Sequence, residues 1–356
     1  MMNKKLKQWG IGLLIAIVVL AVAIIGTLGY QNTKEKQAAK LTTPAIFQTK
    51  ATATYKANGI VGTTAAINKI VTDPIYNQMT ITSVDCKNTA ICQLVSYLVG
   101  NKRYVLLVPT GTGQTTVRVT GQYNQKTYGY DIKVKVTNPN HVKVGVDLSS
   151  YQGKIEADVL KKAGASFAIV RAGHGYSTEK NFSHFIKECQ EDKIDLGLYW
   201  YLSSKDNKTL ITDQEVLDQA NSFVKLLKKN KLQPDDFKYP LYLDLESDTL
   251  YGNVPEVIKI AYVESLAREF FDVLAKAGYK NVGIYANKSY YETYLSNAYF
   301  ASIKHKWYAR YGYVGTKPTI TLNNQNFAPD MWQVGDNFKI QGISKKRIDL
   351  NYYYDK

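Results

Sequence analysis

The tripeptide Asp244-Leu245-Glu246 closes an apolar run, residues 240–245, that predicts a β-strand. Side chains two positions apart on a strand point to the same face, so both carboxyl groups are expected to enter one site. Hydrolysis of a glycosidic bond needs such a pair, because one carboxyl group protonates the leaving oxygen while the other stabilises or attacks the developing oxocarbenium centre. Crowded carboxylates also raise each other's proton affinity, which keeps the acid protonated near neutral pH. An Asp-x-Glu tripeptide is common by chance, so this prediction depends on the elements around it.

From residue 141 onward, strand-like runs alternate with helical stretches. Clear helical periods cover residues 213–230 and 255–277, whereas the last three connections are short or rich in Pro and Asn and leave little room for helices. About 215 residues of this alternation predict an α/β fold, an irregular TIM-like β/α barrel that is imperfect in its last third. The eight predicted strands cover residues 142–148, 167–171, 196–202, 240–245, 282–286, 306–311, 331–334 and 347–352.

Two further aspartates stand on the first and the last of these strands. Asp147 closes the first strand and Asp349 lies in the eighth. The first and eighth strands become neighbours when a barrel closes, so the two side chains are expected to meet across the seam. Active sites of such barrels lie at the C-terminal ends of the strands. The sequence therefore predicts one acidic site made of Asp147, Asp244, Glu246 and Asp349.

Six motifs in a fixed order make this part of the chain resemble a known family. The opening Val144-Gly-Val-Asp-Leu-Ser-Ser-Tyr-Gln-Gly153 is accompanied by Gly197-Leu-Tyr-Trp-Tyr, the Asp-x-Glu strand, Ile284-Tyr-Ala, Trp332-Gln333 and Asp349-Leu-Asn351. In these motifs residues 142–354 are similar to the glycoside hydrolase family 25 lysozymes, the Chalaropsis-type muramidases. The resemblance implies an irregular barrel with too few helices. It also implies hydrolysis of the β-1,4 bond between N-acetylmuramic acid and N-acetylglucosamine in peptidoglycan.

The same resemblance assigns roles residue by residue. Glu246 matches the general acid, and Asp244 its partner, either a nucleophile or the group that orients the N-acetyl carbonyl of the substrate. Asp147 and Asp349 match the other acids of the site. Contacts with sugar are implied for Tyr199, Tyr201, Tyr285, Trp332 and Gln333, although core packing is the alternative for the aromatic residues.

The chain departs from the family pattern at two positions. Trp200 stands where the family often has His, and Asn181 stands where it often has Asp. Neither departure touches the four acids, so they put the fit of the substrate in doubt rather than the catalytic groups.

Other functions compete with this hypothesis. A chitinase-like N-acetylglucosaminide hydrolase would carry further alternating acids on the fourth strand, but position 242 is Tyr. A catalytically inactive wall-binding protein would have no need to crowd four carboxylates. The chain has four histidines, none of which pairs with another at ligand spacing, so neither a metal nor another cofactor is expected. No nucleic-acid-binding signature accompanies the net charge of +15, and no nucleic acid partner is expected.

The N-terminal residues predict a membrane anchor. Residues 9–30 carry no charged side chain and, at about 1.5 Å per helical residue, span roughly 33 Å, which is enough for the hydrocarbon core. We expect residues 1–8 to be a cytoplasmic tail, 9–30 a single transmembrane helix and 31–45 a stalk, with the barrel on the cell-wall side. Lysines flank the segment on both sides, so the positive-inside rule alone does not set the orientation. The apolar run is longer than that of a cleaved signal peptide, which favours an anchor that is retained.

The middle of the chain, residues 46–138, shows strand patterning throughout. Residues 115–123 and 127–136 alternate with period two around a turn at Asn124 and predict a hairpin. Several short strands over about 90 residues indicate a β-sandwich that resembles bacterial immunoglobulin-like spacer modules. Residues 51–140 carry nine basic and three acidic residues, so this domain is expected to act as a spacer that also contacts anionic wall polymers.

The chain contains three cysteines. Cys86 and Cys92 lie in a stretch that predicts a pair of neighbouring strands, residues 80–84 and 91–97. They are expected either to form a disulfide outside the cell or to remain two free thiols. Cys189 lies on the apolar face of a predicted helix and is expected in the core.

Overall fold

The computed structural model describes residues 53–206, 208–250, 254–338, 340 and 347–355. The predicted tail, membrane span and stalk (residues 1–8, 9–30 and 31–45) lie outside the described residues. Within the part of the chain that is described, no helix is both long enough and apolar enough to cross a membrane. Residues 51–356 form one compact unit.

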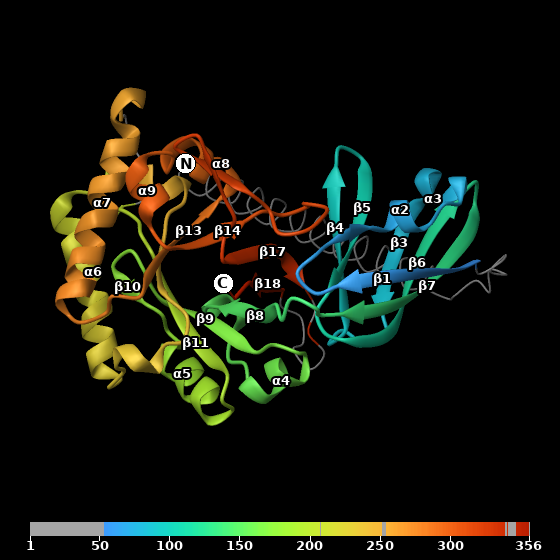
Figure 1. The fold of residues 1–356 in the computed structure, drawn as a ribbon, viewed down its shortest axis with the longest axis horizontal. Helices are drawn as coiled ribbons and strands as arrows, with labels where there is room; N and C mark the ends of the chain where they lie inside the picture. Colours follow the sequence, from blue (N-terminus) through green and yellow to red (C-terminus); the bar gives the residue numbers. More distant parts are fainter. Residues whose placement is uncertain (1–52, 207, 251–253, 339, 341–346, 356) are drawn as a thin grey trace, which may run out of the picture. The chain divides into compact units, whose positions relative to one another are not determined.

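Strands and helices follow one another as in Figure 1. The strands are β1 Ala53–Ile60, β2 Ala65–Ala66, β3 Thr80–Cys86, β4 Cys92–Val99, β5 Lys102–Pro109, β6 Gly113–Tyr123, β7 Lys126–Thr137, β8 Lys143–Leu148, β9 Phe167–His174, β10 Ser177–Thr178, β11 Asp195–Tyr201, β12 Leu241–Asp244, β13 Val282–Asn287, β14 His305–Ala309, β15 Ile320–Leu322, β16 Gln325–Phe327, β17 Met331–Phe338 and β18 Ile348–Tyr353. The α-helices are α2 Ile67–Ile70, α3 Pro74–Gln78, α4 Ala157–Lys162, α5 Phe182–Glu191, α6 Asp213–Lys229, α7 Glu256–Lys276, α8 Lys288–Tyr294 and α9 Ala298–Ser302.

Eight strands close into a barrel in the order β9-β11-β12-β13-β14-β17-β18-β8, and β8 pairs with β9 to complete the ring. The neighbours from β8 through β9 to β17 are parallel, whereas β18 is antiparallel to both β17 and β8. All eight strands predicted from the apolar runs are present. Parallel barrel strands are buried on both faces, which is why they appear in the sequence as continuous apolar runs.

Helices cover only part of the barrel. In Figure 1, α5, α6 and α7 lie outside the strands that they connect. The long helices α6 and α7 confirm the helical periods predicted at residues 213–230 and 255–277. Helix α6 begins with a capping box, in which the Thr212 hydroxyl accepts from the backbone N–H of Glu215 while the Glu215 carboxylate accepts from that of Thr212. Between β14 and β17 the chain forms the small hairpin β15–β16 instead of a helix.

Three apolar clusters fill the unit. One lies between the barrel strands and helices α4 to α9 and contains Cys189, as expected. A second fills the interior of the barrel with large rings, among them Phe167, Tyr242 and Trp307. The third joins the small sheets to the outer faces of β8, β17 and β18 through Val144, Trp332, Val334, Leu350 and Tyr352.

Residues 53–137 form two small sheets, one in the order β1-β7-β6-β3 and one in the order β2-β5-β4. The predicted hairpin is β6–β7, with Asn124 and Gln125 both at positive φ (48° and 61°), as a tight two-residue hairpin turn requires.

The predicted pairing between residues 80–84 and 91–97 is wrong. β3 pairs with β6, whereas β4 pairs with β5 in the other sheet. β4 and β5 are joined by a two-residue loop, Gly100-Asn101, so their local hairpin forms in preference to a pairing with β3. Cys86 and Cys92 are free thiols, and each donates to a backbone carbonyl oxygen, Cys86 to that of Asn88 and Cys92 to that of Gln93 (both 3.3 Å).

The small sheets pack where the barrel lacks helices. The Tyr352 hydroxyl donates to the carbonyl oxygen of Pro109 (2.6 Å), and the Tyr97 hydroxyl donates to that of Val334 (3.3 Å). An isolated antiparallel bridge joins Thr64 to Gly315. Residues of the small sheets therefore cover the outer apolar faces of β8, β17 and β18, as helices cover those of the other strands.

Candidate functional site

A cavity of about 590 Å³ opens at the C-terminal ends of the barrel strands. Its lining contains all four acids predicted from the sequence, together with one more, Asp336, and two cations, Arg171 and Arg347. The acidic residues that line it are Asp147, Asp244, Glu246, Asp336 and Asp349. The structure therefore brings the predicted acidic quartet into one place.

Asp244 and Glu246 are positioned by the end of β12 and the turn that follows. Asp244 is buried and lies between Tyr201 on β11 and Tyr285 on β13 in the strand register. Leu245 points the other way, into the core between strands and helices. The backbone N–H of Glu246 donates to the hydroxyl of the buried Thr249 (3.2 Å), and the N–H of Thr249 donates back to the Glu246 carbonyl oxygen (3.0 Å). This 3₁₀ turn holds the partly exposed Glu246 at the cavity.

Asp147 and Asp349 face each other across the seam of the barrel, as predicted. Burial raises the pKa of Asp349 to about 10, and the negative charge of Asp147 and the hydrogen bond between the two carboxyl groups add to the shift. Burial also raises the pKa of Asp147, while donated hydrogen bonds from Asn351, Gln333 and Asp349 oppose that effect. At neutral pH the pair is therefore expected to hold one proton.

A network of side chains fixes Asp147. Its Oδ2 accepts from Nε2 of Gln333 (2.9 Å) and from Nδ2 of Asn351 (2.8 Å). The Gln333 Oε1 in turn accepts from the hydroxyls of Tyr285 (2.8 Å) and Tyr311 (2.7 Å). Nε1 of Trp307 donates to the Asn351 Oδ1 (2.8 Å), so both amides are oriented with their NH₂ groups toward Asp147.

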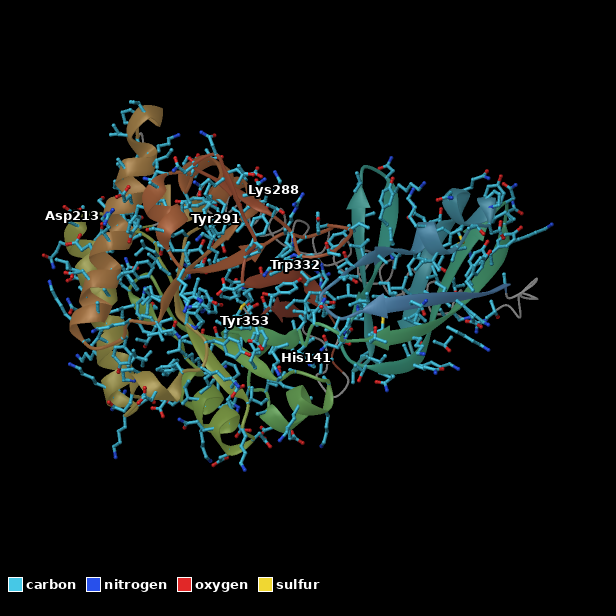
Figure 2. All side chains as sticks on the ribbon, viewed as in Figure 1. His141, Asp213, Lys288, Tyr291, Trp332 and Tyr353 are labelled. Carbon is cyan, nitrogen blue, oxygen red and sulfur yellow. The ribbon has the colours of Figure 1, made fainter. Side chains whose placement is uncertain are left out.

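The predicted sugar-contacting residues do not all reach the cavity. Tyr199, Tyr201, Tyr285 and Gln333 line it, but Trp332 does not. Trp332 is fully buried, and its Nε1 donates to the backbone carbonyl of Arg310 (3.0 Å) in the cluster beneath the small sheets (Figure 2). Successive side chains on β17 point to opposite faces, so Gln333 faces the interior and Trp332 faces outward. The prediction that Trp332 contacts sugar is therefore corrected.

Several residues that line the cavity were not predicted from the sequence. Trp307 lies on a predicted strand, with the same inward orientation as Ala309, and alternation along that strand was the signal that could have identified it. Asp336 lies beyond the predicted end of its strand, after a register shift at Gly335, and no local pattern marks it. The remaining aromatic lining residues are Tyr151 and Tyr311.

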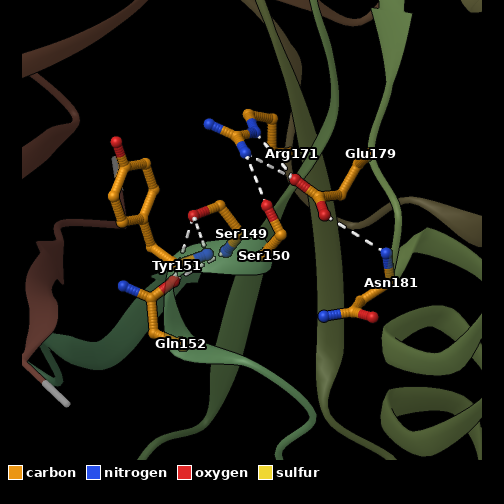
Figure 3. Close-up of polar contacts among 7 residues, drawn as sticks. All are labelled: Ser149, Ser150, Tyr151, Gln152, Arg171, Glu179 and Asn181. Atoms are coloured by element: carbon orange, nitrogen blue, oxygen red, sulfur yellow. Dashed lines mark hydrogen bonds and ion pairs between the residues drawn. The ribbon is translucent and has the colours of Figure 1, made fainter. Parts of the chain in front are cut away.

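Arg171 links the cavity to the loop after β8 (Figure 3). Its Nε donates to the buried Glu179 carboxylate (2.8 Å), and Nη2 donates to the hydroxyl of Ser150 (3.1 Å). Ser149 and Gln152 close a capping box around this turn, which leaves Tyr151 78% exposed at the rim. Asn181, one of the two departures from the family pattern, contributes its backbone N–H to Glu179 (3.2 Å). Asn181 therefore supports the contact between Arg171 and Glu179 through its backbone, without using its side chain.

The arrangement suits acid–base chemistry on a polar substrate. Within the residues that the structure describes, no group of three or more His, Cys, Asp and Glu side chains is arranged to hold a metal ion. The lining combines carboxyl groups with the rings of five tyrosines and one tryptophan, the side chains that bond to and stack on sugars.

Comparisons with known proteins give a family for the chain and solved structures of similar fold. The profile of glycosyl hydrolases family 25 matches residues 146–343. The fold is similar to that of the modular autolysin LytC from Streptococcus pneumoniae in complex with a synthetic peptidoglycan ligand, with a TM-score of 0.50 and 21% identity over 73% of this chain and 58% of that one. A bacterial lysozyme from Streptomyces coelicolor gives a TM-score of 0.49 and 22% identity over 60% of this chain and 93% of that one. The chain thus spans less than two thirds of the length of the autolysin. No curated protein sequence matches it.

Proposed function

The chain belongs to glycosyl hydrolase family 25, whose profile matches more than half of its residues, and we propose that it hydrolyses the β-1,4 bond between N-acetylmuramic acid and N-acetylglucosamine of peptidoglycan. One observation carries the proposal. Asp244 and Glu246 line the same cavity as the Asp147–Asp349 pair, at the end of the barrel where such folds place their chemistry.

Glu246 is the general acid in this proposal. It is the partly exposed member of the Asp-x-Glu pair, so it can reach a glycosidic oxygen that enters from solvent. Asp244 is buried on the floor of the cavity beside Glu246. Its carboxylate orients the N-acetyl group of the substrate, and the carbonyl oxygen of that N-acetyl group attacks the anomeric carbon. This route retains the configuration of the sugar. Attack by Asp244 itself would also retain it, whereas attack by water would invert it.

Asp147 and Asp349 have a supporting role. The Asp147 carboxylate anchors the amides of Gln333 and Asn351, and Gln333 in turn anchors Tyr285 and Tyr311 at the cavity wall. Sugar contacts are assigned to Tyr199, Tyr201, Tyr285 and Gln333, with Trp307 in place of Trp332.

The test is the identification of new reducing ends. The full chain, kept in a mild detergent because of its apolar segment, is incubated with purified peptidoglycan, and the products are reduced and analysed. Reducing N-acetylmuramic acid is the expected product. Reducing N-acetylglucosamine would favour the chitinase-like alternative, and no new ends would favour an inactive wall-binding protein.

The proposed location is the outer face of the cytoplasmic membrane, with residues 9–30 as a single-pass anchor. Two points support it: the uncharged run is long enough to span the hydrocarbon core, and the proposed substrate lies outside the membrane. Protease added to intact protoplasts is expected to remove the barrel. Full protection of the barrel in intact protoplasts would contradict this topology.

The two small sheets are proposed to form an immunoglobulin-like domain that contacts anionic wall polymers. The excess of nine basic over three acidic residues in residues 51–140 supports this contact. Exposed charges more than about 8 Å apart are largely screened at physiological salt, so binding of the full chain to cell walls is expected to weaken as salt rises. Wall binding that is independent of salt would leave the domain as a spacer.

A further inference from the structure

A second cavity, of about 750 Å³, lies between strands β3 and β4 and adjoins the catalytic cavity. Arg347 lines both cavities. Asp336 lines the catalytic one and its neighbour Asn337 lines the second, and the Asn337 amide donates to the Asp336 carboxylate (2.8 Å). The two cavities therefore meet along the irregular end of β17, where the register shifts.

Contacts within the compact unit fix the second cavity in place. Tyr97, on β4, lines it and donates its hydroxyl to the backbone carbonyl of Val334 on β17. The Tyr97 ring also lies against Gly312, next to Tyr311 of the catalytic cavity. The β4–β5 hairpin is thus held beside the mouth of the barrel, and a substrate that occupies the catalytic cavity has this groove as its continuation.

The chemistry of the groove differs from that of the catalytic cavity. Its polar lining consists of the hydroxyls of four Ser and Thr residues and two amides, with Asp85 as an anion and Arg103 as a cation besides Arg347, and its apolar lining includes Val84, Leu94 and Leu98. Of the described residues that line it, Tyr97 alone is aromatic, and its hydroxyl is already engaged. Sugar sites depend on exposed rings for stacking, so this lining does not favour a glycan strand.

The backbone around the groove favours an extended peptide. β3 is the last strand of the four-stranded sheet, and β4 is the last strand of the three-stranded sheet. Edge strands present N–H and C=O groups that can pair with an added extended chain. Arginine side chains bind carboxylates through charge-assisted hydrogen bonds, and no described carboxylate forms an ion pair with Arg103.

We propose that this groove binds the short peptide stem attached to N-acetylmuramic acid, with Arg103 contacting a stem carboxylate. The inference rests on the proposed function, because the stem reaches the groove only when its muramic acid occupies the catalytic cavity. Binding of the stem makes the small sheets part of the substrate-binding surface and gives the hydrolase a preference for glycan strands that carry peptide stems.

The experiment compares two substrates and three forms of the full chain. One substrate is peptidoglycan with intact stems, and the other is the same material with its stems removed by an amidase. The measured quantity is the ratio of kcat/KM for the first to that for the second, taken from the rate of new reducing ends. Loss of one exposed contact between a guanidinium and a carboxylate is expected to lower this ratio about threefold in Arg103→Gln.

Lys102→Gln is the matched control. Lys102 precedes Arg103 on β5 and carries the same charge, but it lies over the Tyr104 ring and does not line the groove. The control is expected to keep the wild-type ratio. A wild-type ratio in Arg103→Gln, or an equal fall in both variants, would overturn the assignment of the groove while the hydrolase activity stands. Absence of cleavage of either substrate would instead refute the proposed function.

Discussion

Burial and a neighbouring charge decide how the acids of the cavity are protonated. The pKa of Asp349 rises to about 10 because the carboxyl group is buried and faces Asp147. Five carboxyl groups around one cavity would repel one another strongly if all were ionised. A proton held by the Asp147–Asp349 pair removes one of these charges, and Oδ2 of Asp147 accepts from Gln333 and Asn351.

Glu246→Gln preserves the shape of the side chain and removes the transferable proton. Activity on peptidoglycan is expected to fall on the order of 10²–10⁴-fold, the usual effect of one acid–base group. The midpoint of thermal unfolding is expected to stay unchanged. The control is Glu191→Gln, an exposed residue of α5 whose only described ion pair is with Lys187 on the same helix. Near-normal turnover in Glu246→Gln would remove Glu246 from the mechanism.

Asp349→Asn is expected to become relatively more stable as pH rises. The unfolded chain loses the Asp349 proton near pH 4, whereas the folded chain keeps it to about pH 10. Between these values the wild type therefore loses stability with rising pH, by up to about 1.4 kcal/mol per unit for one group, and the variant lacks that loss. Unfolding midpoints at pH 5 to 9 measure the difference, with Asp235→Asn as an exposed control. A difference that is constant over this range would mean that Asp349 is ionised in the folded state.

At the scale of the element, strand β17 serves two sides of the barrel wall. Gln333 points inward, where it accepts from two tyrosines and donates to Asp147. Trp332 and Val334 point outward, into the cluster shared with the small sheets. Alternation along one strand thus separates a residue that serves the site from residues that stabilise the fold.

Substitutions on the two faces of β17 are expected to affect different properties, stability on the outward face and activity on the inward face. Trp332→Ala should lower the free energy of unfolding by about 3–5 kcal/mol, with little change in the kcat of the folded fraction. Gln333→Leu leaves the Asp147 carboxylate short of a donor inside the barrel, so activity should fall about 10- to 100-fold, the equivalent of 1–3 kcal/mol. Chemical denaturation and kinetics on peptidoglycan measure both. A loss of kcat in Trp332→Ala without a loss of stability would restore Trp332 to the substrate-contacting set.

At the scale of the whole unit, the small sheets complete the barrel. Strands β8, β17 and β18 have no covering helix among the described residues, and their outward side chains are buried by residues from the two small sheets. A barrel needs both faces of its strands covered. The small sheets therefore cover these three strands, whereas helices cover the other strands of the barrel.

Removal of the small sheets is expected to destabilise the barrel. A fragment of residues 141–356 exposes Val144, Trp332, Val334, Leu350 and Tyr352. Each buried apolar side chain contributes about 1.5–3 kcal/mol. Five of them together are comparable with the whole net stability of a domain, about 5–15 kcal/mol. The fragment should aggregate or bind an apolar dye, and a fragment of residues 51–356 is the control. A soluble 141–356 fragment with an unchanged unfolding midpoint would show that the sheets are dispensable for the barrel.

Local patterns in the sequence were sufficient to predict the eight barrel strands, the long helices and the place of the four acids. These follow from local patterns: apolar runs mark strands that are buried on both faces, and a carboxyl group at the end of such a run lies at the mouth of the barrel. The order of the six motifs also predicted the family. The departures at Trp200 and Asn181 left this result intact, because Trp200 packs in the core behind its strand and Asn181 acts through its backbone.

The folded structure was needed to show which residues that are distant in the sequence lie together. It placed Trp332 outside the barrel and Trp307 inside, paired β4 with β5 rather than with β3, and turned Asp336 into the cavity through a register shift. It also packed the small sheets on the strands without helices and set the Asp147–Asp349 pair in a buried environment that keeps a proton. The physical reason is the same in each case. Orientation, pairing and burial depend on closure of the barrel and on contacts between residues far apart in the chain, which no local pattern encodes.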